Sequence, residues 1–171
     1  WSFADARTVR LREGNKPRPG WLYEIHYEAK NPKVQALGFA ATRDLVSYLR
    51  HDPAALAATG GKVSHALAIG FSQAGRYLRN HLSDGFNRDE QGRRVFDGIY
   101  SHIAGIGRIF FNTPFAQPAR TGTQHEDHDF PENWFPFSTA SVTDPLTGQS
   151  GSLLRGDSSD PLLIETNTST E

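Results

Sequence analysis

Two stretches of the chain carry apolar residues at helical spacing. The first, residues 38–50, places its apolar side chains on one face and stops before a proline that cannot continue a helix. Its apolar positions are Ala41, Leu45, Tyr48 and Leu49, and Asp52-Pro53 closes it. The second begins after Ser72 and presents Ala74, Tyr77, Leu78 and Leu82 before Asp84-Gly85. We therefore predict two amphipathic helices.

Four short segments have the character of β-strands. One alternates strictly between apolar and polar positions, and the other three are mostly apolar. They are residues 21–27, 63–69, 95–103 and 161–165. The order strand, helix, strand, helix, strand predicts an α/β fold with a mainly parallel sheet flanked by helices. The alternation in the first segment is less typical of a central parallel strand, which is usually apolar throughout.

A long segment between residues 108 and 160 has little periodicity but is rich in aromatic residues and prolines. Connections inside compact domains rarely exceed about 15 residues. Aromatic side chains in such numbers are normally buried. We therefore expect a structured insertion that lies over an edge of the sheet or over a site, as a lid would. The whole chain, residues 1–171, is expected to form a single domain with an incomplete fold.

The composition is that of a soluble globular protein, with 37% hydrophobic and 22% charged residues. The net charge of −1 gives no sign of a nucleic-acid-binding surface. No apolar run approaches the ~18 residues of a membrane span. The absence of cysteine excludes disulfides and thiolate metal ligands and leaves the cellular compartment open. The oligomeric state is also left open.

The predicted strand at 63–69 meets the following helix in Gly70-Phe-Ser-Gln-Ala74. This is the G-x-S-x-G pattern of a nucleophile elbow, with alanine in place of the last glycine. Such a turn holds a serine hydroxyl strained and exposed, where a base can activate it. Ser72 is therefore the candidate nucleophile, and an inert serine capping the helix is the alternative. The N–H of Gln73, at the positive end of the helix, is the candidate oxyanion donor.

A serine nucleophile of this kind needs a histidine base, which follows the serine and the acid in chain order. The histidines after Ser72 are His81, His102, His125 and His128. His81 is expected to point away from Ser72 along the helix, and His102 to be a packed core residue. His125 and His128 fall in the insertion, and one of them reaching Ser72 is the less favoured alternative. We expect the catalytic histidine to lie outside this chain.

The acid of such a site is expected just after the strand at 161–165. Glu171 is the candidate, and a solvated surface carboxylate is the alternative for it. Glu165 closes the strand itself. Asp157 and Asp160 precede the strand and are expected to form turns.

A polar run in the insertion, residues 124–129, contains two histidines and three carboxylates. Imidazole and carboxylate suit zinc and similar ions. His125 and His128 are too close for the H-E-x-x-H pattern, in which the second histidine comes one residue later. We therefore favour a solvated segment and predict no metal site and no cofactor.

Five sequence motifs carry a resemblance to a known family. They are Gly38-Phe-Ala-Ala-Thr-Arg-Asp-Leu-Val, Gly70-Phe-Ser-Gln-Ala-Gly-Arg-Tyr-Leu-Arg, Phe96-Asp-Gly-Ile, Ile103-Ala-Gly and Thr166-Asn-Thr-Ser-Thr-Glu. From Trp21 to its end the chain resembles a family of α/β-hydrolase domain proteins with a serine-esterase-like elbow. The resemblance implies that Ser72 is the nucleophile and that the family has a small residue at the position of Ala74. It also implies an internal fragment that lacks the first strands, the second oxyanion loop and the histidine strand.

Together these features predict a serine esterase that acts on a small-molecule carboxylic ester. Ser72 would form the acyl-enzyme, Gln73 would hold the oxyanion, and Glu171 would orient the histidine. The fragment by itself is expected to be inactive. The alternatives are a noncatalytic binding module on the same fold and a metal-dependent enzyme that uses His125 and His128.

Overall fold

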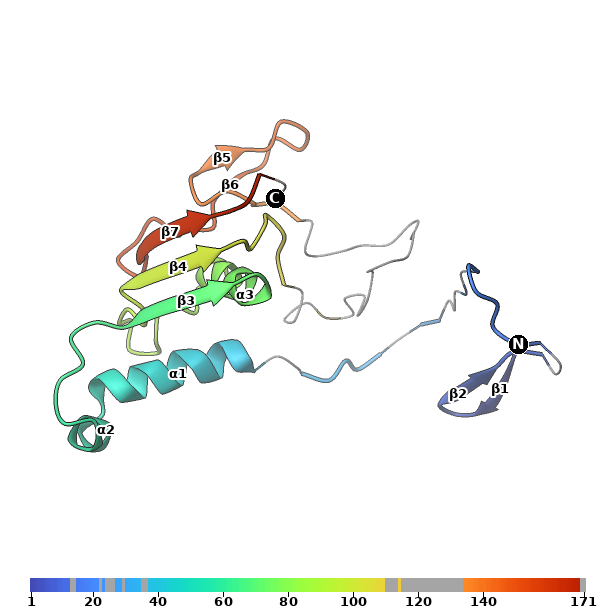
Figure 1. Ribbon diagram of the computed structural model, residues 1–171, viewed down its shortest axis with the longest axis horizontal. Helices are drawn as coiled ribbons and strands as arrows, with labels where there is room; N and C mark the ends of the chain where they lie inside the picture. Colours follow the sequence, from blue (N-terminus) through green and yellow to red (C-terminus); the bar gives the residue numbers. More distant parts are fainter. Residues whose placement is uncertain are drawn as a thin grey trace.

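A computed structural model describes most of the chain. The residues described are 1–12, 15–21, 23, 27–28, 30–34, 37–109, 114 and 134–169. The elements in chain order are β1 (Ser2–Asp5), β2 (Thr8–Arg10), α1 (Gly38–His51), α2 (Pro53–Ala58), β3 (Leu67–Phe71), α3 (Gln73–Ser83), β4 (Gly98–His102), β5 (Val142–Thr143), β6 (Ser150–Gly151) and β7 (Leu162–Thr166). β1 and β2 form an antiparallel hairpin that lies apart from the other elements (Figure 1).

The centre of the molecule is a three-stranded sheet in the order β3-β4-β7. Both strand pairs are parallel, with Leu67 opposite Gly98 and Gly98 opposite Leu162. The three strands therefore finish together, at what we call the carboxyl end of the sheet, and start together at its amino end (Figure 1). The predicted α/β fold with parallel strands is confirmed, as a small sheet with few helices.

The predicted helix at 38–50 is confirmed as α1, and the residues after it begin α2. Asp52 has an extended backbone, with φ −80° and ψ 129°. Its carboxylate accepts hydrogen bonds from the N–H groups of Ala54 and Ala55, at 2.8 and 3.4 Å. Pro53 takes the first position of α2, where a helix needs no N–H donor. Asp52-Pro53 thus ends one helix and caps the next.

The hydrophobic core lies between α3 and one face of the sheet. Its buried residues are Leu78, Leu82, Val95, Phe96 and Ile99. Burial of such side chains stabilises the fold by roughly 1.5–3 kcal/mol each. α1 reaches the same core through Val46, and the ring of Phe39 stacks on that of Tyr77 with centroids 4.5 Å apart. α1 and α3 therefore cover the same face of the sheet.

The other face of the sheet is apolar and exposed. Its side chains alternate along β3 and β7 with those that face α3. The most exposed are Leu67, Ile69, Phe71, Leu162 and Ile164, each 57% or more exposed. Parallel sheets are normally covered on both faces. This face therefore has the character of an interior surface.

β3 and β4 both begin later than the segments predicted at 63–69 and 95–103. Before β3, the N–H of Ala66 donates to the Asp97 carboxylate at 2.9 Å, and the N–H of Asp97 donates to the carbonyl of Ala66 at 2.8 Å. Before β4, Asn87 likewise accepts hydrogen bonds from the N–H groups of Val95 and Phe96, through its carbonyl and its side-chain oxygen. Side chains of Asp97 and Asn87 thus bond the backbone N–H groups of Ala66 and Phe96 just before the two strands, so hydrophobicity alone misplaced the starts. β7 lies within one residue of its predicted bounds.

The described part of the predicted insertion packs onto the core. Leu153 is 2% exposed, and Leu154 contacts the core residues. Arg79 of α3 donates to the carbonyl of Phe137 at 2.5 Å. Asp157 and Asp160 accept backbone hydrogen bonds within the turn that leads to β7, as expected.

Several predicted features fall partly or wholly outside the described residues. Residues 115–133 of the insertion are among them, so a lid stays a prediction. Residues 22 and 24–26 are also outside, and the described residues Trp21, Tyr23 and Tyr27 of the strand predicted at 21–27 belong to no strand. Within the described ranges, no helix is both long and apolar enough to cross a membrane.

Candidate active site

β3 turns into α3 at Ser72, at the carboxyl end of the sheet. Ser72 has φ 53° and ψ −120°, while its neighbours belong to regular elements. A positive φ costs a residue with a side chain roughly 1 kcal/mol or more. The Ser72 N–H donates to the carbonyl of His102 at 2.8 Å, and its own carbonyl accepts from the N–H of Arg76 at 3.0 Å. Strand pairing and helix together hold this serine strained and exposed.

The turn at Ser72 requires small residues on both sides. A Cβ added at Gly70 would lie 2.5 Å from the carbonyl oxygen of Ala74. A Cβ at Gly75 would lie 2.9 Å from Oγ of Ser101 and 3.0 Å from the carbonyl oxygen of Gly70. Both contacts are too short for real atoms. The chain therefore folds tightly at Gly70, and Gly75 brings α3 close to the sheet.

Gln73 is the first residue of α3 and is exposed. N–H groups in the first turn of a helix have no partner within the helix. They carry the positive end of the helix dipole, and α3 has no acidic residue in its first turn to neutralise it. The backbone beside Ser72 can therefore receive negative charge.

His102 lies next to the elbow and is not the core residue that the sequence suggested. It is partly exposed on the open face, because it is opposite Phe71 and shares that strand's outward register. Its Nδ1 lies 2.7 Å from Oγ1 of Thr166, and the Tyr100 hydroxyl lies 3.0 Å from the same oxygen. The ring also meets that of Phe71 edge-on, with centroids 5.3 Å apart. His102 is thus tied to the last residue of β7.

His81 lies near the far end of α3 and belongs to the core. It is fully buried, and neither ring nitrogen has a hydrogen-bond partner in the part of the chain described. Its ring lies within 6.3 Å of four aromatic rings, those of Phe39, Tyr77, Phe86 and Phe96. Burial, with a smaller effect from Arg43, lowers the pKa of His81 to about 4. His81 is therefore a neutral core residue.

Of the predicted site residues, the structure describes Ser72 and Gln73 and places them side by side at the turn. Glu171, His125 and His128 lie outside the described residues. Glu165 forms an ion pair with Arg79, which ties β7 to α3. In the described ranges, no group of three or more potential metal ligands lies together.

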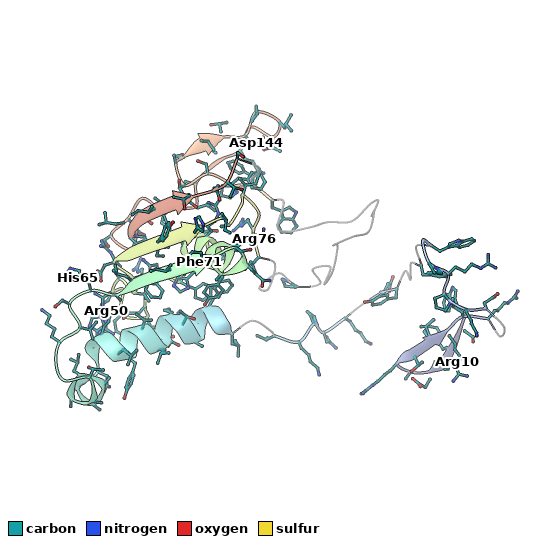
Figure 2. The ribbon with its side chains drawn as sticks, viewed as in Figure 1. Arg10, Arg50, His65, Phe71, Arg76 and Asp144 are labelled. Carbon is teal, nitrogen blue, oxygen red and sulfur yellow. The ribbon has the colours of Figure 1, made fainter. Side chains whose placement is uncertain are left out.

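Two features of the carboxyl end escaped the sequence analysis. Ile103, which follows β4, has φ 47°, an uncommon conformation for a β-branched residue. Ile103 begins one of the five family motifs, but nothing in that motif predicts a positive φ. Arg76 donates through Nε to the carbonyl of Ala104 at 3.3 Å (Figure 2). Arg76 stands in the elbow motif, four residues after Ser72, and this spacing could have drawn attention to it.

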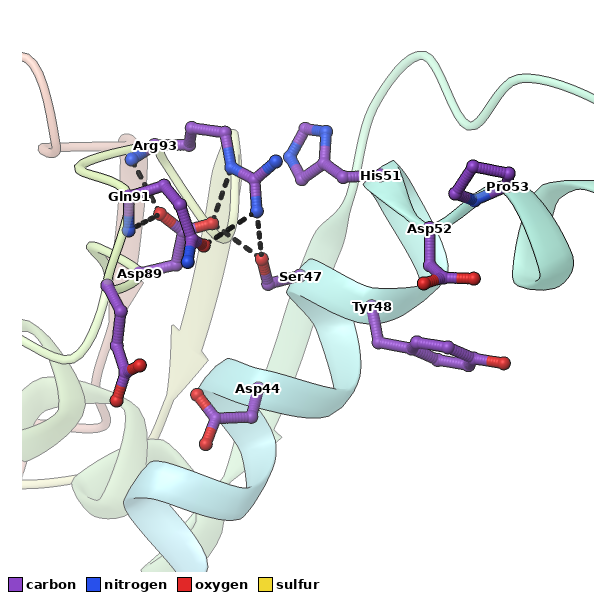
Figure 3. Close-up of a pocket in the computed structure, with 10 residues that line it drawn as sticks. Asp44, Ser47, Tyr48, His51, Asp52, Pro53, Asp89, Gln91 and Arg93 are labelled. Carbon is purple, nitrogen blue, oxygen red and sulfur yellow. Dashed lines mark hydrogen bonds and ion pairs between the residues drawn. The ribbon is translucent and has the colours of Figure 1, made fainter.

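A separate cavity of about 390 Å³ lies between α1 and the residues before β4 (Figure 3). In its wall the Ser47 hydroxyl donates to the Asp89 carboxylate at 2.5 Å, and Arg93 donates to the same carboxylate at 2.7 Å. Burial alone would raise the pKa of Asp89, but these bonds hold it at about 2. His51 lines the cavity too, and burial and Arg93 lower its pKa. A carboxylate with so low a pKa is too weak a base to activate the Ser47 hydroxyl, so we interpret this cluster as fastening α1.

Comparison with known proteins places the elbow in context. The model of the alpha/beta hydrolase domain family matches residues 5–163, which include β3, Ser72, α3 and β4. The match begins before Trp21, where the resemblance was expected to begin, and stops short of residues 166–171. Comparisons with curated proteins and with solved structures gave no match. The chain belongs to the alpha/beta hydrolase domain family.

Proposed function

We propose that this chain carries the nucleophile of a serine hydrolase that cleaves carboxylic esters. One observation carries the proposal: Ser72 is exposed, with φ 53°, at a strand–helix turn in a chain of the hydrolase family. Strained backbone at an exposed polar residue is typical of functional sites. Gly70 and Gly75, which permit the tight turn, support the same interpretation.

The proposed reaction is acyl transfer in two steps. Oγ of Ser72 attacks the ester carbonyl while a histidine takes its proton. The oxyanion forms near the N–H of Gln73, where the dipole of α3 stabilises it. The tetrahedral intermediate collapses, the alcohol leaves with the proton from the histidine, and an ester to Ser72 remains. Water then attacks this acyl-enzyme by the same route and releases the acid.

The remaining members of the proposed site are Glu171 and a histidine that lies outside residues 1–171. Glu171 would accept a hydrogen bond from that histidine and hold its ring toward Ser72. Among the described residues the His102 ring makes hydrogen bonds with Thr166 and Tyr100 and none with the Ser72 hydroxyl, so it is not our choice for the base. We infer that residues 1–171 alone have negligible turnover, because loss of the base removes most of the activation of the serine.

The test uses the longest natural chain that contains these residues and a short-chain 4-nitrophenyl ester. We expect a burst of nitrophenolate, an acyl adduct on Ser72 and steady hydrolysis afterwards. Ser72→Ala should abolish all three. Ser64→Ala, which removes an exposed serine before β3, is the matched control and should retain them.

Two results would replace the proposal with one of its alternatives. Undiminished hydrolysis by Ser72→Ala, with loss of activity in a chelator, would favour a metal-dependent enzyme that uses His125 and His128. A folded chain that binds esters but forms no adduct would favour a noncatalytic binding module.

A further inference from the structure

Arg76 lies one turn of α3 after Ser72. Residues four apart share a face of a helix, and helical side chains lean toward the N-terminus. The Arg76 side chain therefore extends toward the carboxyl end of the sheet, where its Nε donates to the carbonyl of Ala104 at 3.3 Å. Ala104 lies two residues after His102, whose carbonyl holds the N–H of Ser72. The guanidinium is thus beside the elbow (Figure 2).

Arg76 has no anionic partner in the part of the chain described. Its single hydrogen bond is to the backbone of Ala104. By contrast Arg79, on the same helix, pairs with Glu165, and Arg108 pairs with Asp84. Arg76 is partly buried, so part of its hydration is lost without an opposite charge in return. No described residue occupies its terminal nitrogens, which can therefore bind a ligand.

The loop after β4 presents a glycine, Gly105, to the guanidinium of Arg76. A Cβ added at Gly105 would lie 3.9 Å from a terminal nitrogen of Arg76. Glycine at this position, with φ 65°, keeps side-chain atoms away from that nitrogen. The N–H of Gly105 donates to the side-chain oxygen of Asn167 at 3.3 Å, which ties this loop to the end of β7. The loop after β4, the end of β7 and α3 therefore meet around the guanidinium of Arg76.

We propose that Arg76 binds a carboxylate of the substrate, so that the preferred esters carry an acidic group a short chain away from the scissile carbonyl. This inference rests on the proposed function of Ser72. A guanidinium presents two parallel N–H donors that match the two oxygens of a carboxylate. The positive end of α3 adds to the attraction. Because the guanidinium reaches back to the elbow, the carboxylate that it binds would lie a short chain away from the scissile carbonyl, as in a monoester of a short dicarboxylic acid.

The test compares monoethyl glutarate with ethyl pentanoate, which has a methyl group in place of the free carboxylate. In the longest natural chain, kcat/KM should be higher for the glutarate ester, and added salt should reduce that preference. Arg76→Gln should lower kcat/KM for the glutarate ester by about tenfold or more and change that for ethyl pentanoate by less than about threefold. Arg76→Lys, which keeps the charge without the paired donors, should retain part of the preference.

Arg155→Gln is the matched control. It removes the same charge near Gly85, beyond the other end of α3, and should leave the ratio of the two substrates unchanged. If Ser72 forms an adduct but Arg76→Gln lowers kcat/KM equally for both esters, Arg76 only supports the loop at Ala104 and this inference is wrong. It is also wrong if Arg76→Gln changes kcat/KM for neither ester. If no variant or natural chain hydrolyses either ester and Ser72 forms no adduct, the proposed function fails and the inference with it.

Discussion

The two ends of the central sheet are built differently. At the amino end, Asp97 joins the strands and α1 through polar contacts: its carboxylate accepts from the N–H of Ala66 at 2.9 Å and pairs with Arg50 at 2.9 Å. Its carbonyl accepts from the N–H of Leu162 at 2.9 Å. At the carboxyl end, Ser72 and Ile103 both have positive φ. Figure 2 shows Arg50 at the first end and Arg76 at the second.

The difference separates the residues that hold the fold from those that we assign to chemistry. Ion pairs and buried hydrogen bonds at the amino end stabilise the order of the strands. The carboxyl end instead contains strained backbone, the start of a helix dipole and a cation without an anionic partner among the described residues. Such features lower stability and are retained where a site uses them. Variants at the two ends should therefore fail in different ways.

The largest effect is expected at the elbow, from Gly70→Ala. The new Cβ would lie 2.5 Å from the carbonyl oxygen of Ala74, which is backbone and cannot rotate away. We expect a loss of about 3–5 kcal/mol in the free energy of unfolding and no reaction at Ser72. Urea denaturation measures the first. Gly38→Ala at the start of α1, where nothing lies within 4 Å, is the control and should cost nothing. A stable, reactive Gly70→Ala protein would show that the turn is not tight.

At the amino end, Asp97→Ala should lower the free energy of unfolding by about 2–3 kcal/mol. The change removes the acceptor for the Ala66 N–H and leaves Arg50 without its partner. Asp97→Asn keeps an acceptor oxygen and should lose less. The folded fraction should react at Ser72 as before, which labelling at low urea can check. Loss of reactivity in a fully folded Asp97 variant would contradict the separation of the two ends.

A smaller effect is expected from pH, through His81. Its pKa is about 4 in the folded protein, whereas an exposed histidine has its ordinary pKa of about 6.5. Between these values the unfolded chain binds more protons, so stability falls as the pH falls. We expect this histidine to account for a loss of about 2 kcal/mol between pH 7 and pH 5.

His81→Phe isolates that contribution, because carboxylates also titrate at low pH. The variant should show a flatter dependence of unfolding free energy on pH than the natural protein. Parallel curves for His81→Phe and the natural protein would mean that His81 is not neutral in the folded state.

The helices and the elbow could be predicted from sequence because local rules determine them. Helical spacing defined α1 and α3, and Asp52-Pro53 marked the boundary after α1. Small residues around Ser72 marked the turn. The starts of β3 and β4 could not be predicted, because side chains of Asp97 and Asn87, distant in sequence, bond the preceding backbone.

The partners at the carboxyl end depend on the register of parallel strands, which no local pattern contains. His102 reaches Thr166 only because β4 and β7 pair with these two residues opposite one another. The positive φ of Ile103 likewise depends on its tertiary surroundings. The candidate acid Glu171 stays a prediction, since it lies outside the described residues.

The central claim is that Ser72 is the reactive nucleophile, and peptide mapping after fluorophosphonate labelling tests it most directly. The longest natural chain that contains these residues should carry one adduct, on the peptide with Ser72. Prior unfolding in urea should abolish the labelling, because the strained turn is lost. No adduct on Ser72 in the folded protein, or equal labelling of several exposed serines, would contradict the claim.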